Sequence, residues 1–299
     1  MFKKILIPLD GSNLAEASLS PAVALAKKME APIVLLHVIE EDAPQEIHND
    51  HHLDNVEDAV KYLDKISKKI SSENIHVEGH VHSAKVKDVA ASINQHANEE
   101  FNSDLIVMCA HGKSGFRDLI FGNIAQQVLA DGRSTILLMQ SEIKDSPPFS
   151  LKRILIPLDS QSIHDESLIY GMGLAKAFDA ELYILTIIPT YSTLSGEDAA
   201  VGKMLPGTVS AFLDILENEA KDHVQLHLDE CLKAGISTEA EIGRGDPATL
   251  IVSTAERTRT DLIVLSTHKK AGIEAFWSHS VAPSVIKKTH IPLLLIPLN

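Results

Sequence analysis

Short apolar runs alternate with amphipathic stretches along the first half of the chain. The runs are rich in Ile, Leu and Val and carry few charges, a composition typical of strands buried on both faces of a parallel sheet. We expect strands at residues 5–9, 32–39, 75–81, 105–109 and 135–139. Because each strand is followed by a helix-forming stretch, the pattern indicates a doubly wound α/β domain with right-handed crossovers and helices on both faces.

The stretches between the runs carry apolar residues at helical spacing. Residues 13–29 place Ala15, Leu19 and Ala22 on one helix face, and Pro21 inside that helix predicts a bend. Further helices are expected at residues 54–72, 86–99 and 123–130.

The chain repeats itself, which is a sign of a duplicated domain. KKILIPLD at residues 3–10 returns as KRILIPLD at residues 152–159. Two further matches follow in the same order, between residues 104–108 and 261–265 and between residues 135–139 and 292–296. A polar segment with a Pro-Pro pair separates the copies, and helices and central strands both reject such a pair. The sequence therefore predicts one domain at residues 1–140, a linker at 141–150 and a second domain at 151–299.

Composition narrows the class of protein. The net charge is −14 and no basic run reaches five residues, which argues against nucleic-acid binding. No apolar run approaches the ~20 residues that cross a bilayer, so no membrane association is expected. The amino terminus lacks the features of a signal peptide, and Cys109 and Cys231 are expected as free thiols. These features predict a cytoplasmic protein.

Ligands of open α/β sheets bind beyond the carboxyl ends of the strands, where the strand order reverses. This rule selects residues 10–12, 37–39 and 109–115. The last segment contains Gly112 and Gly115, and a helix is expected to begin near Gly122 and Asn123. One interpretation is a phosphate cradle built from glycine amides and a helix N-terminus. The other is a tight turn followed by an ordinary Asn cap, and spacing alone leaves both open.

The loop, the D-L-I-V strand before it and the L-I-P-L-D opening together resemble the universal stress protein family, over nearly all of both halves. That family's nucleotide binders carry Gly-x2-Gly-x9-Gly-Ser/Thr, whose glycines and hydroxyl residue hold the phosphates and ribose. Here the motif runs through Cys109, Gly112, Gly122 and Asn123, so Cys and Asn replace the first glycine and the hydroxyl residue. The resemblance implies two tandem Rossmann-like domains of the adenine nucleotide alpha-hydrolase type, each with five parallel strands.

The resemblance also implies roles for residues of the first half. Asp10 would lie near the ribose or a metal ion, and the backbone of Val38 would contact adenine. Pro8, Met108 and Ile124 would line the pocket. The implied ligand is ATP, with or without Mg²⁺, in the first domain only.

The second half departs further from the motif. All three glycines are missing, because Ser266, Lys269 and His279 stand at their positions, and only the final hydroxyl residue, Ser280, remains. Asp159 persists, and the glycine-containing residues 243–247 precede a helix, as a similar turn often does in the family. A degenerate binding loop is therefore expected.

A histidine group and a cysteine are the other candidate sites. His80 and His82 occupy alternate positions of a strand and share one face, as metal ligands do, and His51 and His52 offer a further imidazole. No acidic or cysteine partner stands at diagnostic spacing, so solvent-facing histidines and no metal site are expected. Cys109 is interpreted as a buried structural thiol rather than a reactive one.

The leading hypothesis is a regulatory or protective stress-response protein that binds ATP in its first half without efficient turnover, with no catalytic residue assigned. A protein-interaction scaffold without nucleotide is the alternative from another class. A slow ATPase using Arg117, or a thiol-dependent enzyme, is a weaker one. The two halves are expected to form an intramolecular pseudo-dimer, with residues 135–139 and 292–296 near the interface, and a further homodimer stays open.

Overall fold

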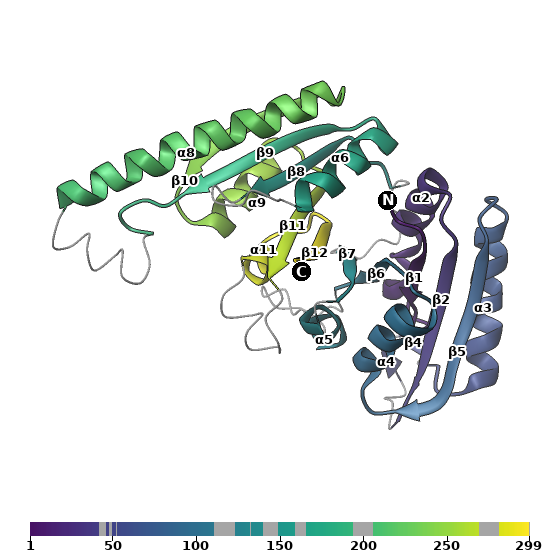
Figure 1. Cartoon of the computed structure of the whole chain (residues 1–299). Helices are drawn as coiled ribbons and strands as arrows, with labels where there is room; N and C mark the ends of the chain where they lie inside the picture. Colours follow the sequence, from purple (N-terminus) through teal and green to yellow (C-terminus); the bar gives the residue numbers. More distant parts are fainter. Residues whose placement is uncertain are drawn as a thin grey trace. The chain divides into compact units, whose positions relative to one another are not determined.

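The computed structural model divides the chain into two units, residues 1–150 with 267–299 and residues 151–266 (Figure 1). The structure describes residues 1–41, 46–47, 50–51, 53–110, 123–131, 133–139, 149–158, 166–193, 206–268 and 281–298.

The first unit is built on a mostly parallel sheet with the strand order β12-β7-β6-β1-β2-β5. Each neighbouring pair is parallel except β12 and β7. The strands are β1 (Ile5–Pro8), β2 (Ile33–Glu40), β5 (Val77–Val86), β6 (Leu105–Cys109), β7 (Thr135–Met139) and β12 (Leu293–Leu298), and a separate hairpin joins β3 (Glu46–Ile47) and β4 (Asp50–His51). Strands lie where the apolar runs of the first half predicted them, which confirms the α/β fold class.

Helices of the first unit cover both faces of its sheet. The crossovers run outward from β1 to β5 and then return to β6 and β7, so right-handed connections place the two sets of helices on opposite faces. Figure 1 accordingly shows α3 and α4 on opposite sides of β5. The helices are α1 (Asn13–Glu16), α2 (Leu19–Met29), α3 (Val56–Ser71), α4 (Val89–Gln95), α5 (Asn123–Asp131) and α11 (Ala282–Lys288), and a π-helical turn, His96–Glu100, extends α4.

The predicted bend at Pro21 lies elsewhere. The helix expected over residues 13–29 breaks between α1 and α2, where the hydroxyl of Ser18 donates to the carbonyl oxygen of Ala15 at 2.5 Å. Pro21 is buried in the first turn of α2. The first N–H groups of a helix have no partner within the helix, so proline is tolerated there without a kink.

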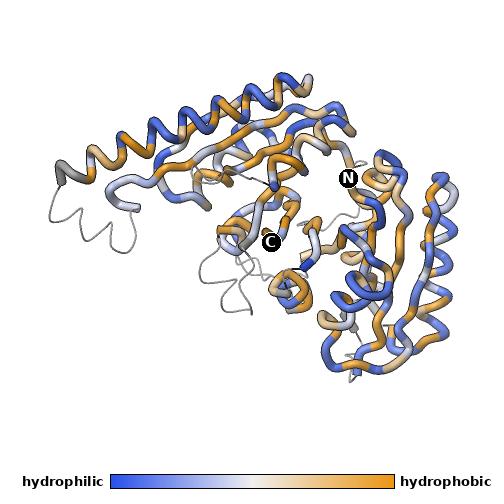
Figure 2. The backbone as a smooth tube through the Cα atoms, in the orientation of Figure 1, coloured by the Kyte–Doolittle hydropathy of each residue, from blue (hydrophilic) through white to orange (hydrophobic). Residues whose placement is uncertain are grey.

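The second unit repeats the plan with the strand order β10-β9-β8-β11, all of whose described pairings are parallel. Its elements are β8 (Arg153–Leu158), α6 (Glu166–Phe178), β9 (Glu181–Ile188), α8 (Pro206–Lys233), β10 (Thr238–Arg244), α9 (Pro247–Arg257) and β11 (Leu262–His268). Figure 2 shows the strands as mainly hydrophobic and α8 as a helix of alternating hydropathy.

The last strand of the second repeat packs with the first unit. β12 pairs antiparallel with β7, with Leu293 opposite Leu138 and Leu295 opposite Ile136, and all four side chains are buried. The strands at residues 135–139 and 292–296 are thus hydrogen-bonded neighbours. Because contacts group residues 267–299 with the first unit, the domain boundaries drawn from the sequence repeat stay a prediction.

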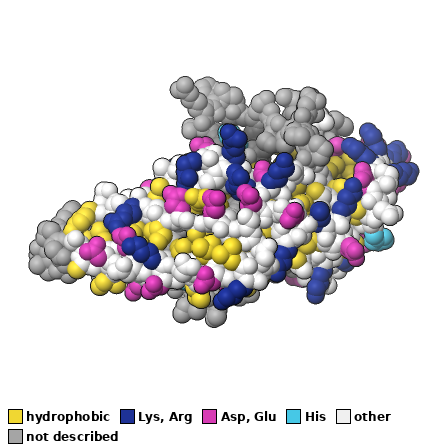
Figure 3. All heavy atoms as spheres, turned by 90° about the horizontal axis from the view of Figure 1, so that it is seen from above, with side chains coloured by type: hydrophobic (Ala, Val, Ile, Leu, Met, Phe, Trp, Pro, Cys, Tyr) yellow, Lys and Arg dark blue, Asp and Glu magenta, His cyan; other side chains and the backbone are white. Residues whose placement is uncertain are grey.

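The surface drawn in Figure 3 carries Lys and Arg side chains interspersed with Asp and Glu. Among the described residues, no helix has the length and the apolar character needed to cross a membrane. The long helix α8 carries charged residues from Asp214 to its end at Lys233.

Candidate functional site at the strand ends

The carboxyl ends of β6, β1 and β2 meet at one edge of the first unit's sheet. β1 is the central strand of the three, because Ile5 pairs with Ile33 of β2 on one side and with Leu105 of β6 on the other. The chain passes from β1 toward β2 first and returns to β6 later, so the strand order reverses here. Such a switch point is where open α/β sheets bind ligands.

Asp10 follows β1 at this edge, and its carboxylate organises the turn into α1. Its Oδ1 atom accepts hydrogen bonds from the backbone N–H of Ser12 at 2.9 Å and from the Ser12 hydroxyl at 2.6 Å. The Ser12 oxygen in turn accepts from the N–H of Ala15 at 3.1 Å and caps α1. Gly11 has a φ of 92°, which a residue with a side chain rarely adopts. The turn therefore holds a partly exposed carboxylate at the strand end.

Cys109 ends β6 beside Asp10. Burial, reinforced by the negative charge of Asp10, raises the pKa of the Cys109 thiol to about 12, while a backbone hydrogen bond from Ser18 acts against this. The residue keeps partial exposure, so the sulfur atom is the part shielded from water. A thiol in this state is protonated at neutral pH and is a poor nucleophile. This agrees with its interpretation as a structural thiol.

The side chain of His37 connects the end of β1 with the chain before α3. The buried ring lies between two carbonyl oxygens, with Nδ1 at 2.7 Å from that of Leu9 and Nε2 at 2.9 Å from that of Leu53. A neutral imidazole donates to one carbonyl at a time. The sequence marked residues 37–39 as a strand end but gave no sign that His37 would join β1 to the chain before α3.

A family model described as the universal stress protein family matches residues 1–138 and again residues 150–297. The chain belongs to the universal stress protein family.

The chain is also similar to individual relatives and solved structures. This universal stress protein is 30% identical over 145 residues to universal stress protein MJ0531 of Methanocaldococcus jannaschii, covering 48% of this chain and 81% of the relative. A universal stress protein structure from Archaeoglobus fulgidus covers 98% of this chain and 97% of its own, with a TM-score of 0.68 and 19% identity, which establishes the fold alone. Another Archaeoglobus fulgidus structure, a complex with dAMP, has a TM-score of 0.34 over 50% of this chain and 98% of its own, at 20% identity.

The implied binding residues of this universal stress protein divide into two groups. Five of them lie at or near the strand ends: Pro8, Asp10, Val38, Met108 and Cys109. Val38 and Met108 are buried, and Pro8 is partly exposed. The glycines Gly112, Gly115 and Gly122 lie outside the described residues. Asn123 begins α5 as expected, although only its backbone is described, and Ile124 is exposed.

The second half differs at the corresponding strand end. Thr186 takes the place of His37, and its buried hydroxyl has no hydrogen-bond partner among the described residues. Asp159, Lys269, His279 and Ser280 lie outside the described part of the chain. Ser266, the position of the first motif glycine, is described and is partly exposed.

The glycine-containing segment at residues 243–247 of the second half is a helix start. Asp246 caps α9, accepting from the backbone N–H of Thr249 at 2.9 Å and from its hydroxyl at 2.5 Å, and Pro247 is the first helical residue. Gly245 has a φ of 144°. Capping thus accounts for this segment without a ligand.

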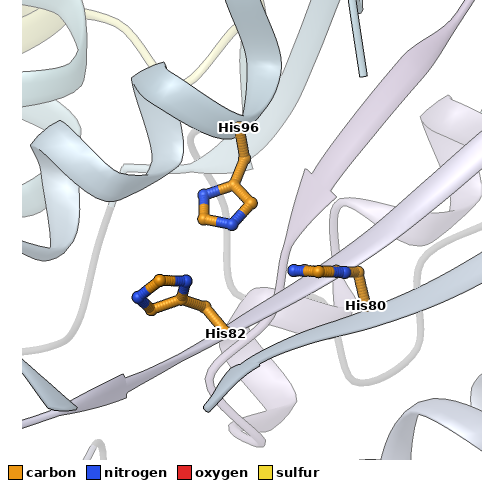
Figure 4. A group of neighbouring side chains, drawn as sticks. All are labelled: His80, His82 and His96. Carbon is orange, nitrogen blue, oxygen red and sulfur yellow. The ribbon is translucent and has the colours of Figure 1, made fainter. Parts of the chain in front are cut away.

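The expectation that His80 and His82 face solvent is wrong. Both are only partly exposed, and their rings lie against the buried ring of His96 (Figure 4). Burial, followed by the proximity of His96 and His80, lowers the pKa of His82, while Glu100 acts in the opposite direction. His96 stands 14 positions beyond His82, on another element, so strand periodicity could not associate them. Of His51 only the backbone in β4 is described, and His52 is outside the described residues.

Proposed function

We propose that this universal stress protein binds an adenine nucleotide, with or without Mg²⁺, in its first half and acts as a regulatory or protective protein of the stress response. The observation that supports this proposal most directly is the position of the Asp10 carboxylate. It accepts hydrogen bonds from Ser12 and lies where the strand order reverses, between β2 and β6.

The strand-end residues fit the parts of a nucleotide. The carboxylate of Asp10 accepts hydrogen bonds, as ribose hydroxyls require, and offers an oxygen ligand of the kind Mg²⁺ prefers. The backbone of Val38 would supply polar groups for adenine, and the apolar side chains of Pro8 and Met108 would line the pocket, as the resemblance implies. The amides of residues 112, 115 and 122 and of Asn123 would hold the phosphates, as the family motif implies.

Efficient turnover is not part of the proposal. The thiol of Cys109 is protonated and cannot serve as a nucleophile or base at neutral pH. The Oδ1 atom of Asp10 already accepts hydrogen bonds from Ser12, and this arrangement suits a role in binding. We therefore infer that the nucleotide acts as a bound signal rather than as a consumed substrate.

An interaction scaffold is the second candidate, and a specific feature of the second half favours it. Thr186 leaves a buried hydroxyl without a partner among the described residues where His37 bridges two carbonyls. A second half that does not bind a nucleotide can instead bind a partner protein. Together with the pairing of β7 and β12, this supports an intramolecular pseudo-dimer with one binding half.

Calorimetric titration of the full chain with ATP and Mg²⁺ tests the proposal. We expect one site per chain, an increase in melting temperature at saturating ATP, and loss of both in Asp10→Ala. Asp10→Asn is the matched control for folding, because an amide oxygen can still accept from Ser12 while the charge is gone. Absence of heat and of any thermal shift at millimolar ATP would contradict nucleotide binding and leave the scaffold.

A further inference from the structure

Two histidines of the edge strand β5 project from the face of the sheet opposite α3. His80 and His82 alternate along the strand and so share one face. Gly79, between them and the strand's start, belongs to the other face, because a Cβ atom added to it would lie 3.5 Å from the Cβ of Leu63 in α3. The two imidazoles therefore project toward α4 and the π-helical turn.

A third histidine meets them there. His96 begins the π-helical turn, and its ring centroid lies 5.1 Å from that of His80 and 5.0 Å from that of His82. The candidate ligand nitrogens of the three rings all lie within 4.8 Å of one another. In Figure 4 the rings converge from β5 and from the start of the turn. We call His80, His82 and His96 the histidine cluster.

The ring of His96 is already oriented as a metal ligand. Its Nδ1 lies 2.6 Å from the carbonyl oxygen of Ser92, to which it donates, so Nε2 is the ring nitrogen left to bind a metal ion. A backbone carbonyl that fixes the second ring nitrogen is the usual partner of a metal-binding histidine. Burial of His96 holds the ring in this orientation.

A carboxylate stands beside the cluster. Glu100 places one oxygen 3.3 Å from Nε2 of His96 and the other 3.8 Å from Nδ1 of His80. Its side chain remains about half exposed, so it can turn toward an ion. Three imidazoles and one carboxylate make a ligand set that zinc accepts in tetrahedral geometry.

We propose that the histidine cluster, with Glu100 as fourth ligand, binds a divalent transition metal ion, and Zn²⁺ in the first place. Metal–nitrogen distances of about 2.0–2.1 Å in a tetrahedron put neighbouring ligands about 3.3 Å apart. The present nitrogens must therefore close by at most about 1.5 Å. Rotation of the partly exposed His80 and His82 rings toward His96 would bring these nitrogens closer together.

A comparison with the second half sets this region apart. Asp88 and Asp246 cap equivalent helices, and Asp104 and Asp261 each bind the backbone N–H groups that open the first strand of their half. Asp104 follows Asp88 by 16 positions, whereas Asp261 follows Asp246 by 15. One extra residue in a helix is what a π-helical turn accommodates, and such turns occur frequently at functional sites. The extra residue lies in the segment that carries His96 and Glu100.

The second half has an ion pair at the strand position that corresponds to His80. By strand register, Glu241 and Gly243 occupy the positions of His80 and His82. Glu241 accepts from the Tyr183 hydroxyl at 2.6 Å and pairs with Arg257. An ordinary ion pair fills this position, so the metal site belongs to the first half alone.

Titration of metal-free full-length protein with Co²⁺ and then with Zn²⁺ tests the proposal. We expect one ion per chain, the visible absorption of tetrahedral Co²⁺, and its displacement by Zn²⁺ with a rise in melting temperature. His82→Gln, and independently His80→Gln, should each weaken Zn²⁺ binding by at least about 100-fold, since removing even an outer partner of a ligand costs 10–100-fold. In the presence of chelator these variants should melt close to the wild-type chain.

Two control variants test whether the metal ion binds at the histidine cluster. His76→Gln changes an exposed histidine just before β5 and should bind as wild type does. His223→Gln/His227→Gln removes the other close pair, whose Nε2 atoms are 3.0 Å apart on α8, and should also leave binding unchanged. Wild-type affinity in His82→Gln and His80→Gln, loss of binding in the α8 variant, or an octahedral Co²⁺ spectrum would each overturn the proposal.

Discussion

The first and second halves of this chain use the same strand interior and differ where the strands end. Ile5, Leu6 and Ile7 of β1 are inaccessible to solvent, and so are their equivalents at residues 154–156 of β8. At the carboxyl end of the next strand, however, the ring of His37 contacts two carbonyl oxygens, while the Thr186 hydroxyl has no hydrogen-bond partner among the described residues. The two repeats therefore share the apolar residues inside the sheet and differ in the side chain at this strand end.

The amino-terminal ends of the strands show how closely the scaffold is kept. The carboxylate of Asp104 accepts from the N–H groups of Lys3 and Lys4 at 2.8–3.1 Å. Asp261 accepts from the N–H groups of Lys152 and Arg153 at 2.8 and 2.9 Å. Equivalent hydrogen bonds at this edge contrast with different residues at the other edge, where the proposed ligand would bind.

The largest effect should come from the shared interior. Ile7→Ala and Ile156→Ala each remove buried methyl groups and leave a cavity, so each should lower the free energy of unfolding by about 2–5 kcal/mol. Urea unfolding followed by circular dichroism measures both. A loss below about 1 kcal/mol in one half only would show that the two interiors are not equivalent.

The shared aspartates should come next. Asp104→Ala and Asp261→Ala leave backbone N–H groups without their acceptor, and each should destabilise its half by about 1–3 kcal/mol. Hydrogen exchange of the N–H groups of residues 3–4 and 152–153 locates the effect. Protection unchanged in either variant would contradict the assigned role.

The strand ends should respond in opposite directions. Thr186→Val removes a buried hydroxyl that has no partner among the described residues and keeps the shape, so it should raise the free energy of unfolding by about 1 kcal/mol. His37→Ala removes a buried ring that contacts two carbonyls and should lower it. Thermal unfolding of the two variants, side by side, tests this contrast. Destabilisation by Thr186→Val would mean that the hydroxyl is bonded after all.

The smallest effect concerns the thiols, one in each half. Burial raises the pKa of both Cys109, to about 12, and Cys231. At pH 8 only about one Cys109 thiol in 10⁴ is ionised, so alkylation of the native protein should be far slower than that of the unfolded chain. Because the folded pKa is above the unfolded value of 9.0, the associated stability is complete below pH 9 and is lost as pH rises toward 12. Rapid alkylation of Cys109 at pH 8 would contradict this.

Sequence periodicity predicted the strands well because strands buried on both faces read as uninterrupted apolar runs. It predicted the helix around Pro21 but placed the bend wrongly, since proline in a first turn causes none. The pairing of Leu293 with Leu138 joins residues 155 positions apart, which no local pattern encodes.

The sequence indicated the strand-end site but not the histidine cluster, and the difference has a physical reason. Asp10 and Val38 stay predictions as ligand contacts, and they were selected because ligands of parallel sheets gather at strand ends, a rule that needs only strand order. The histidine cluster was missed because His96 reaches β5 through helix packing. The one-residue difference between the repeats, from Asp88 to Asp104 and from Asp246 to Asp261, was the available signal.

One measurement tests most directly whether binding belongs to the first half alone. Asp10→Ala and Asp159→Ala remove equivalent aspartates of the two repeats, and each is titrated with ATP and Mg²⁺ beside the wild-type chain. The account predicts one site in the wild type, none in Asp10→Ala and one unchanged site in Asp159→Ala. Two sites in the wild type, with one lost in each variant, would contradict it.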